Sequence, residues 1–563
     1  MKKAFTAFLI LISLTLMYGC ESSYFYGPDS YYSDAEWNGG NSVLNGKPFY
    51  EDKTIYNNDK DGDVTCLYLT VREGKDLALK KSYSFGYLKS YTDSDITAGE
   101  EPFCNVLMSV GTTDKSTIPG NFGYLETVTN ATLTVKGDTE KIKQRSFQLK
   151  LFDRAGLWNG MKTINLMKNT NDISRVKEKL CFDVVEKINN ISGFRTGFVR
   201  LFTRDTTETD TNLLWVDNGI YTFVEQPNKA YLTSRGYDSS GYLYRSKDFN
   251  FKTNPALIDV GDPKYNATDF EKILSIRAGK NHTSLINTIK NVNSPDVDIN
   301  TLMGLSFNEE NMLTYMAINI LFANCRAYND DYLLYAPSDS MTWYFLCEGF
   351  RDVFNCYDPE NKIPLHIMSY SFLQNNLLFS KYLKTPANRI KLSKKLDEIK
   401  NIITTDYINS QISIYKSSIL RYIYSMPEIL LLPDSAEKVE PYMKSFATMI
   451  ESQYNAAKKA LEGPLAPYIT DITFNDDNTV IKYDGVSDGT VTYKLQFSTE
   501  EDFSTIFFTS PAVSSTSITL QGFKKQSCFV RVIATDNQGQ IAYSSNIESS
   551  YMGQTVYGCA IFE

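Results

Sequence analysis

Alternating hydrophobic and polar positions mark the chain from residue 64 onward. Four runs carry this pattern, CLYLTV, CNVLMSV, ATLTVKG and SFQLKLF. Alternation places successive side chains on opposite faces, which is typical of half-buried strands. The pattern predicts one mostly antiparallel sheet. Before it, residues 21–45 are rich in Tyr, Ser, Asn and Gly, a composition that suits a flexible tether. We therefore expect a tether and a β-rich region over residues 21–124.

The centre of the chain changes to helical spacing. Apolar side chains recur at helical intervals over residues 311–321, and a polar segment follows at 324–331. Two aromatic-rich strand candidates come next, Tyr332–Tyr335 and Trp343–Leu346, separated by a Pro-Ser-Asp turn. The pattern predicts a helix, a polar loop and a hairpin, with carboxylates at the ends of these segments.

Two more amphipathic helices and a second β-rich region are predicted towards the C-terminus. The helices cover residues 387–403 and 435–461, and the Gly-Pro-Leu-Ala-Pro segment at 463–467 reads as a linker. About seven short alternating runs follow, which predict a two-sheet sandwich over residues 468–550. The run Phe529–Asp536 resembles a strand of fibronectin type III modules. Such modules on exported proteins serve mostly as spacers or docking surfaces.

Composition and charge exclude several classes of function. A chain of 563 residues is long enough for two or three domains. The formal net charge of −9, with no basic aromatic groove, argues against a nucleic-acid partner. The only two histidines are His282 and His366, so a His-rich metal site or a Ser-His-Asp hydrolase is not expected.

The first twenty residues resemble a bacterial lipoprotein signal. Lys2 and Lys3 precede an apolar stretch at 4–17 that is too short to span a bilayer, and Gly19-Cys20 ends the segment. The resemblance implies cleavage before Cys20 and acylation of its thiol. The lipid bilayer is then a partner, and we expect the protein in the bacterial cell envelope, anchored outside the cytoplasm in the outer membrane. An uncleaved membrane anchor is the alternative.

An ordered series of motifs resembles the CotH spore-coat kinase family over residues 125–462. The series runs through ATLTVKGDTEKIKQRSFQLKL, FRTGFVRLF and NGIYTFVEQPNKAYL. Its most specific pieces are Asn165-Leu166, Arg175 with the helix that follows it, Gly219–Tyr221 and Glu225-Gln226. The resemblance implies an atypical protein-kinase-like fold, with ATP and Mg²⁺ as cofactors. No phosphate-binding G-x-x-x-x-G-K-S loop is present.

Candidate nucleotide-binding residues lie on the strands of this region. Lys136, Lys143 and Arg145 can supply groups that face phosphates, although their alternation also fits a solvated strand face. Glu225 closes a predicted strand. In a kinase-like fold a carboxylate there orients a nucleotide-binding lysine, and an exposed charge at a sheet edge is the alternative.

The expected catalytic base is missing from the polar loop. The motif of the family at this point is N-x-D, and the resemblance implies that its Asp acts as the general base. Here Asn324 is kept, but Arg326 stands two positions later. A guanidinium does not accept a proton at neutral pH, so the catalytic residue is unknown.

The expected metal ligands are altered too. The family's Asn before the aromatic strand corresponds to Asp331, or to Asp330 if the loop shifts. The W-D-x-D element reads Cys-Glu-Gly-Phe, so Glu348 keeps a carboxylate, while Asp352 substitutes for the second acid only with a two-residue shift. Asp330, Asp331, Glu348 and Asp352 are therefore candidate metal ligands. Scattered surface carboxylates are the alternative.

The sequence as a whole predicts an α+β protein with a kinase-like core, a β-rich segment before it and an all-β sandwich after it. Because the base and one acid are replaced, we expect a degenerate catalytic centre and a binding or scaffold role toward an extracytoplasmic protein or glycan. The alternative is an active ATP- and Mg²⁺-dependent kinase that phosphorylates extracytoplasmic proteins.

Overall fold

The computed structural model describes most of the chain after residue 49. The described residues are 50–57, 59–72, 82–92, 101–112, 119–137, 144–207, 214–350, 353–354, 369–475, 478–486, 489–500, 502–551 and 554–561. They belong to one unit, Leu44–Glu563. The predicted signal segment and tether lie outside the described residues. Among the helices described, none combines the length and the apolar character that crossing a membrane requires.

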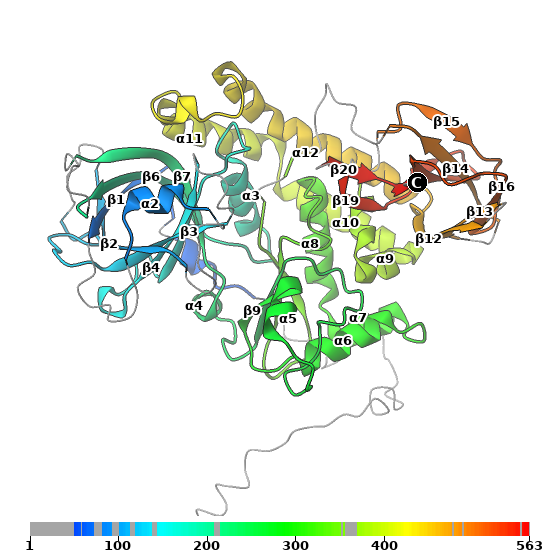
Figure 1. The fold of residues 1–563 in the computed structure, drawn as a ribbon, viewed down its shortest axis with the longest axis horizontal. Helices are drawn as coiled ribbons and strands as arrows, with labels where there is room; N and C mark the ends of the chain where they lie inside the picture. Colours follow the sequence, from blue (N-terminus) through cyan, green and yellow to red (C-terminus); the bar gives the residue numbers. More distant parts are fainter. Residues whose placement is uncertain are drawn as a thin grey trace, which may run out of the picture. The chain divides into compact units, whose positions relative to one another are not determined.

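A closed barrel forms the N-terminal part of the described chain (Figure 1). Its strand order is β1-β2-β3-β4-β5-β7-β6, and β1 pairs in parallel with β6 to close it. The predicted antiparallel pairing of the first four strands is confirmed. The barrel strands are β1 Val64–Arg72, β2 Phe103–Gly111, β3 Ala131–Lys136, β4 Ser146–Leu151, β5 Thr163–Met167, β6 Thr196–Asp205 and β7 Val216–Glu225.

Alternation along the strands fills the barrel interior. Leu67, Leu69 and Val71 of β1 are fully buried and belong to one apolar cluster with Leu133 and Leu149 of β3 and β4. Closure removes the free edges that an open sheet would expose. Strands from before and after residue 125 therefore share one core.

A second sheet and a set of helices follow the barrel. The sheet order is β11-β10-β8-β9, from β8 Tyr242–Ser246, β9 Leu274–Ala278, β10 Tyr332–Ala336 and β11 Tyr344–Cys347. The predicted helix and hairpin at the centre of the chain are confirmed as α8 (Glu309–Leu321), β10 and β11. Every side chain of α8 from Asn311 to Leu321 is buried, so the helix runs through the core.

The remaining helices pack on this sheet, on the barrel and on each other. The predicted helices near residues 387–403 and 435–461 are confirmed as α10 (Pro386–Ile402) and α12 (Val439–Glu462). The shorter or additional helices are α2 Phe85–Ser90, α3 Lys177–Glu186, α4 Lys229–Ser234, α5 Ala267–Ile273, α6 Thr283–Asn293, α7 Ile299–Ser306, α9 Leu377–Leu383 and α11 Thr405–Ile423.

The C-terminal part is β-rich, as predicted, and its strands form two larger sheets and one two-stranded sheet. Apolar side chains from both larger sheets, such as Ile481, Leu495 and Val532, form one separate core. One sheet contains β12 Tyr468–Asn475, β13 Asn478–Asp484 and β16 Ser517–Gln521. The other contains β14 Val491–Ser498, β15 Ile506–Thr509, β17 Cys528–Asp536, β18 Ile541–Tyr543 and β21 Cys559–Ile561, and β19 Ile547–Tyr551 pairs with β20 Gln554–Tyr557. The likeness to fibronectin type III modules stays a prediction.

A buried arginine joins the start of the described chain to the end of β7. The Arg235 side chain is 0% exposed, and its Nε lies 2.9 Å from Glu51 Oε1. Its Nη2 lies 2.6 Å from Glu225 Oε2, and its guanidinium lies over the ring of Tyr231. The attraction between the buried guanidinium and the two carboxylates offsets the cost of removing all three charges from water.

A second buried cluster joins the barrel to the loop after α11. Glu428 is 0% exposed and forms ion pairs with Lys168 and Arg175. Its Oε1 also accepts a hydrogen bond from the Ile220 backbone N–H at 2.9 Å. Burial lowers the pKa of Lys168 to about 8, although the Glu428 carboxylate raises it in part.

Candidate functional site

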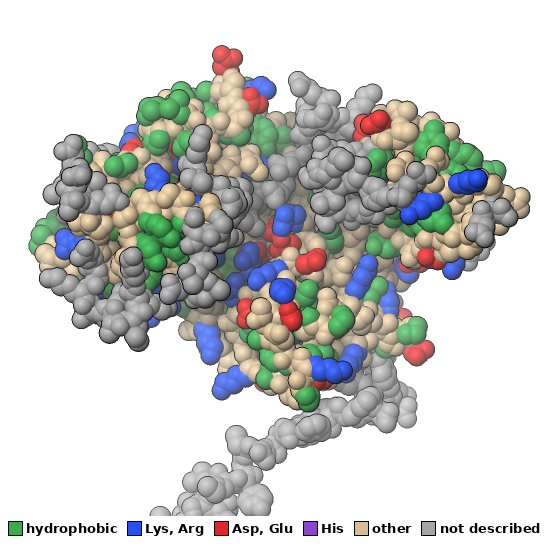
Figure 2. All heavy atoms as spheres, viewed as in Figure 1, with side chains coloured by type: hydrophobic (Ala, Val, Ile, Leu, Met, Phe, Trp, Pro, Cys, Tyr) green, Lys and Arg blue, Asp and Glu red, His purple; other side chains and the backbone are tan. Residues whose placement is uncertain are grey.

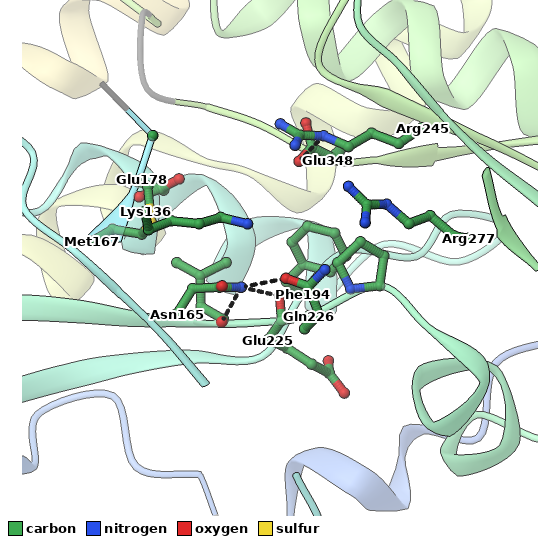
Figure 3. Close-up of a pocket in the computed structure, with 13 residues that line it drawn as sticks. Lys136, Asn165, Met167, Glu178, Phe194, Glu225, Gln226, Arg245, Arg277 and Glu348 are labelled. Carbon is green, nitrogen blue, oxygen red and sulfur yellow. Dashed lines mark hydrogen bonds and ion pairs between the residues drawn. The ribbon is translucent and has the colours of Figure 1, made fainter. Parts of the chain in front are cut away.

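A cavity of about 220 Å³ lies where the barrel strands end and the second sheet begins (Figure 3). Figure 2 shows lysine, arginine and acidic side chains gathered side by side near β9. The cavity is lined by Lys136, Gly137, Asn165, Met167, Glu178, Phe194, Val224, Glu225, Gln226, Pro227, Arg245, Arg277 and Glu348.

Two arginines from neighbouring strands face this cavity. Arg245 of β8 is ion-paired, with Nε 2.8 Å from Glu348 Oε1. Arg277 of β9 is the extra residue of a β-bulge, because Leu243 pairs with Ala278 while Tyr244 pairs with Ile276. A bulge redirects a side chain locally. In Figure 3 both guanidinium groups point towards the centre of the cavity.

The surroundings of Arg277 disfavour the charge on its guanidinium. Burial lowers the pKa of Arg277, and the Arg245 charge lowers it further. The Arg277 Nε is buried and has no hydrogen-bond partner among the described residues. This guanidinium has therefore lost water without gaining a protein acceptor at that nitrogen.

Three carboxylates converge beside the cavity. Asp330 and Asp331 precede β10, and Glu348 follows β11, so the pairing of Tyr332 with Cys347 brings the acids together. Ligand oxygens of all three lie within 4.8 Å of one another, and the Glu348 N–H donates to the Asp331 carbonyl at 3.1 Å.

A glycine makes room for one of these acids. A Cβ at position 349 would lie 2.4 Å from Asp331 Oδ1, so only glycine fits there. Asp331 itself has φ of 58°, in the left-handed region that Asp tolerates better than most residues. The hairpin geometry therefore holds the Asp331 carboxylate in place.

Arg326 lies on the same acids. It is ion-paired with Asp330, and its Nε is 3.9 Å from Asp331 Oδ2. With the pair between Arg245 and Glu348, each of the three carboxylates has a guanidinium beside it. The oxygen donors suit Mg²⁺. The two guanidinium groups offset part of the negative charge that would attract the ion, whereas Glu348 Oε2 is buried without a hydrogen-bond partner among the described residues and stays available as a ligand.

Asn324 supports the loop. Its side chain is 0% exposed, and Nδ2 donates to Asn319 Oδ1 at 2.9 Å and to the Gly349 carbonyl at 3.1 Å.

Phe350 occupies the next position where the family resemblance places an acid. Its buried ring packs edge-on against Phe182 and Phe322. The side chain at this position therefore makes apolar contacts.

The barrel contributes amides and a lysine. Asn165 Nδ2 donates to Gln226 Oε1 at 2.9 Å and to the Val224 carbonyl at 3.1 Å. Asn165 Oδ1 in turn accepts from Gln148 Nε2 at 2.8 Å. In Figure 3 the Lys136 side chain extends from the end of β3 into the cavity.

The sequence-predicted residues divide between the cavity and other places. Lys136, Glu225 and Glu348 line the cavity, and Asp330 and Asp331 adjoin Glu348. The Glu225 carboxylate pairs with Arg235 rather than with a lysine, and in Figure 3 it points away from the cavity.

Arg145 does not line the cavity. It is buried, donates to the Leu88 carbonyl at 3.1 Å and packs over the ring of Tyr91. Neither a phosphate-facing role nor a solvated strand face describes it, because its charge is used to tie α2 to the barrel. Lys143, Asp352 and Cys20 lie outside the described residues.

Sequence reasoning missed Arg245, Arg277 and Glu178 as cavity residues. Arg245 lies in the strand sequence YLYRS of β8, where alternation could have placed it on one face of the strand. The bulge that directs Arg277 leaves no Gly or Pro signal in LSIRA, so no local pattern reveals it.

A barrel, a helical body with its own sheet, and a charged cavity at their junction define an α+β protein with a candidate ligand site. The family model of the CotH kinase protein matches residues 133–451, more than half of the chain. The chain therefore belongs to the CotH kinase family. The match contains every cavity-lining residue but neither β1 and β2 nor the C-terminal sheets. The comparison with curated proteins found no match.

Proposed function

We propose that the protein is a CotH-family member without efficient phosphoryl transfer, acting as a binding or scaffold protein in the bacterial cell envelope. The observation that carries this proposal is Arg326, which stands at the expected base position and is paired with Asp330 beside Asp331. Its partners in the envelope are a protein or a glycan.

The chemistry of this position argues against catalysis. A general base must accept the proton of the attacking hydroxyl, and a guanidinium has no acceptor. Losing such a base costs about 10²–10⁴-fold in rate. The same guanidinium offsets the negative charge that a divalent cation would need. The position where the family resemblance places the second acid is occupied by Phe350, which is buried.

An active kinase is the second candidate. The convergence of Asp330, Asp331 and Glu348 beside a cavity favours it, since scattered surface acids would not meet within 4.8 Å. Phosphoryl transfer depends mainly on positioned charge, so a surviving acid cluster is the feature that would matter most.

Incubation of the purified chain with Mg²⁺, γ-labelled ATP and a general protein acceptor separates the two. We expect no label on the chain or the acceptor above the level of the Glu348→Ala variant. Transfer that Glu348→Ala abolishes, and that the exposed-site control Glu437→Ala retains, would contradict the proposal and establish the kinase.

Anchoring through Cys20 is a separate part of the proposal. It is supported by the lysines, the short apolar stretch and Gly19 before Cys20. We expect cells fed labelled palmitate to label the wild-type chain and the Cys559→Ala control, and to leave Cys20→Ala unlabelled. Label that persists in Cys20→Ala would overturn the anchor. A membrane-bound but unlabelled wild type would favour the uncleaved segment.

A further inference from the structure

We propose that the cavity is an anion site for a phosphate-bearing ligand, bound without a divalent cation by Arg277, Arg245 and Lys136. The inference rests on the proposed function, because it takes arginines to occupy the place of the metal. It goes beyond that function by naming the ligand chemistry and the residues that recognise it.

Glu178 lines the cavity as well as Glu348, so Arg277 is distinguished by the lack of an ion pair with any described residue and not by a surplus of positive charge. Glu348 is paired with Arg245, and Asp330 and Asp331 lie beside Arg326. Arg277 has no ion pair with any described residue. Because a desolvated cation is costly unless an anion accompanies it, the cavity favours an anionic ligand.

The donor geometry suits phosphate in particular. A guanidinium presents a planar fork of N–H groups that matches two phosphate oxygens, and here two such forks come from adjacent strands. Lys136 extends towards the same space from the opposite wall in Figure 3. A phosphate group between these side chains would receive charge-assisted hydrogen bonds from both walls.

A glutamine amide is oriented to add a neutral donor. Gln226 Oε1 accepts from Asn165 Nδ2 at 2.9 Å, and the Asn165 orientation is set by its bonds to Val224 and Gln148. The Gln226 nitrogen therefore faces away from Asn165, and Figure 3 places it on the side of Arg277. An amide N–H₂ there can donate to an oxyanion.

The size of the cavity limits what it encloses. A volume of about 220 Å³ falls below the roughly 300–1,000 Å³ of pockets for drug-sized ligands. It suits a phosphate or pyrophosphate group. The remainder of a larger ligand, such as the nucleoside of a nucleotide, would lie outside this cavity.

Calorimetric titration of the full chain with pyrophosphate, in EDTA and separately in Mg²⁺, tests the proposal. We expect saturable binding in EDTA that Mg²⁺ does not strengthen. Arg277→Ala should weaken it about ten- to a hundredfold, since a lost charge-assisted hydrogen bond has that effect, and Arg277→Lys should weaken it less. Arg154→Ala, an exposed arginine on the barrel, should bind as wild type. Thermal melting confirms that each variant is folded.

Other outcomes decide between the proposals. Binding that requires Mg²⁺ would overturn this inference and favour the kinase. No binding of pyrophosphate or ATP under either condition, or equal binding by folded Arg277→Ala, would overturn the inference while leaving the absence of phosphoryl transfer untouched. Equal affinity for pyrophosphate and ATP would assign recognition to the phosphates, whereas tighter ATP binding would identify a nucleotide as the source.

Discussion

Replacing Arg235 with methionine is expected to lower the free energy of unfolding by about 3–5 kcal/mol, because it removes one partner of a buried ion cluster. The side chain is fully buried between Glu51 and Glu225. Methionine fills much of the space but leaves Glu225 without its cation, while Glu51 keeps only Lys53, at 2.6 Å. The ion cluster also ties the start of the described chain to β7, so the loss reaches two distant segments.

Chemical denaturation measures this loss. The free energy of unfolding should fall in Arg235→Met, and an exposed-site control such as Arg154→Met should change it by less than about 1 kcal/mol. A triple variant with Glu51→Gln and Glu225→Gln added should recover part of the stability, because neutral amides are cheaper to bury than unpaired carboxylates. A loss below about 1 kcal/mol in Arg235→Met would show that the cluster contributes little.

Replacing Glu428 with glutamine is expected to destabilise the fold by a similar amount, about 3–5 kcal/mol, for the converse reason. Lys168 and Arg175 are then two buried cations without an anion, with exposed side-chain fractions of 1% and 3%. Because Glu428 also accepts from the Ile220 N–H, the junction of the barrel with the loop after α11 loosens.

The destabilisation of Glu428→Gln should depend on pH. The folded pKa of Lys168, about 8, is already below its ordinary value, and it falls further when the carboxylate that raises it is removed. A lowered folded pKa means that the folded chain releases the proton at a lower pH than the unfolded chain does. Between these two pKa values the free energy of unfolding therefore rises with pH. In the variant this rise in stability begins at a lower pH than in the wild type, because the folded pKa of Lys168 is lower. Its deficit should be smaller at pH 9 than at pH 6, and a deficit that grows with pH would contradict this account.

Local patterns predicted much of the fold. Alternation in CLYLTV and its three successors marked β1 to β4, and helical spacing marked α8, α10 and α12. Closure of the barrel was not predicted, because it depends on the parallel pairing of β1 with β6. Those strands lie more than a hundred residues apart, and no short-range signal encodes such a pairing.

The candidate site was predicted in part. The acids near 330 and 348 meet because a hairpin register brings its two ends together, which the turn between β10 and β11 made foreseeable. The guanidinium groups of Arg245 and Arg277 were not foreseen as cavity residues. Arg277 owes its direction to a bulge, and the partner of Glu225 proved to be Arg235, a residue without any motif.

The packing of the Phe350 ring limits which side chains position 350 can hold. Its contacts with Phe182 and Phe322 mean that an aspartate substituted there would place a carboxylate against aromatic rings. An acid at this position would therefore be costly to bury unless the surrounding side chains changed with it. The packing around Phe350 thus favours an apolar side chain at this point of the chain.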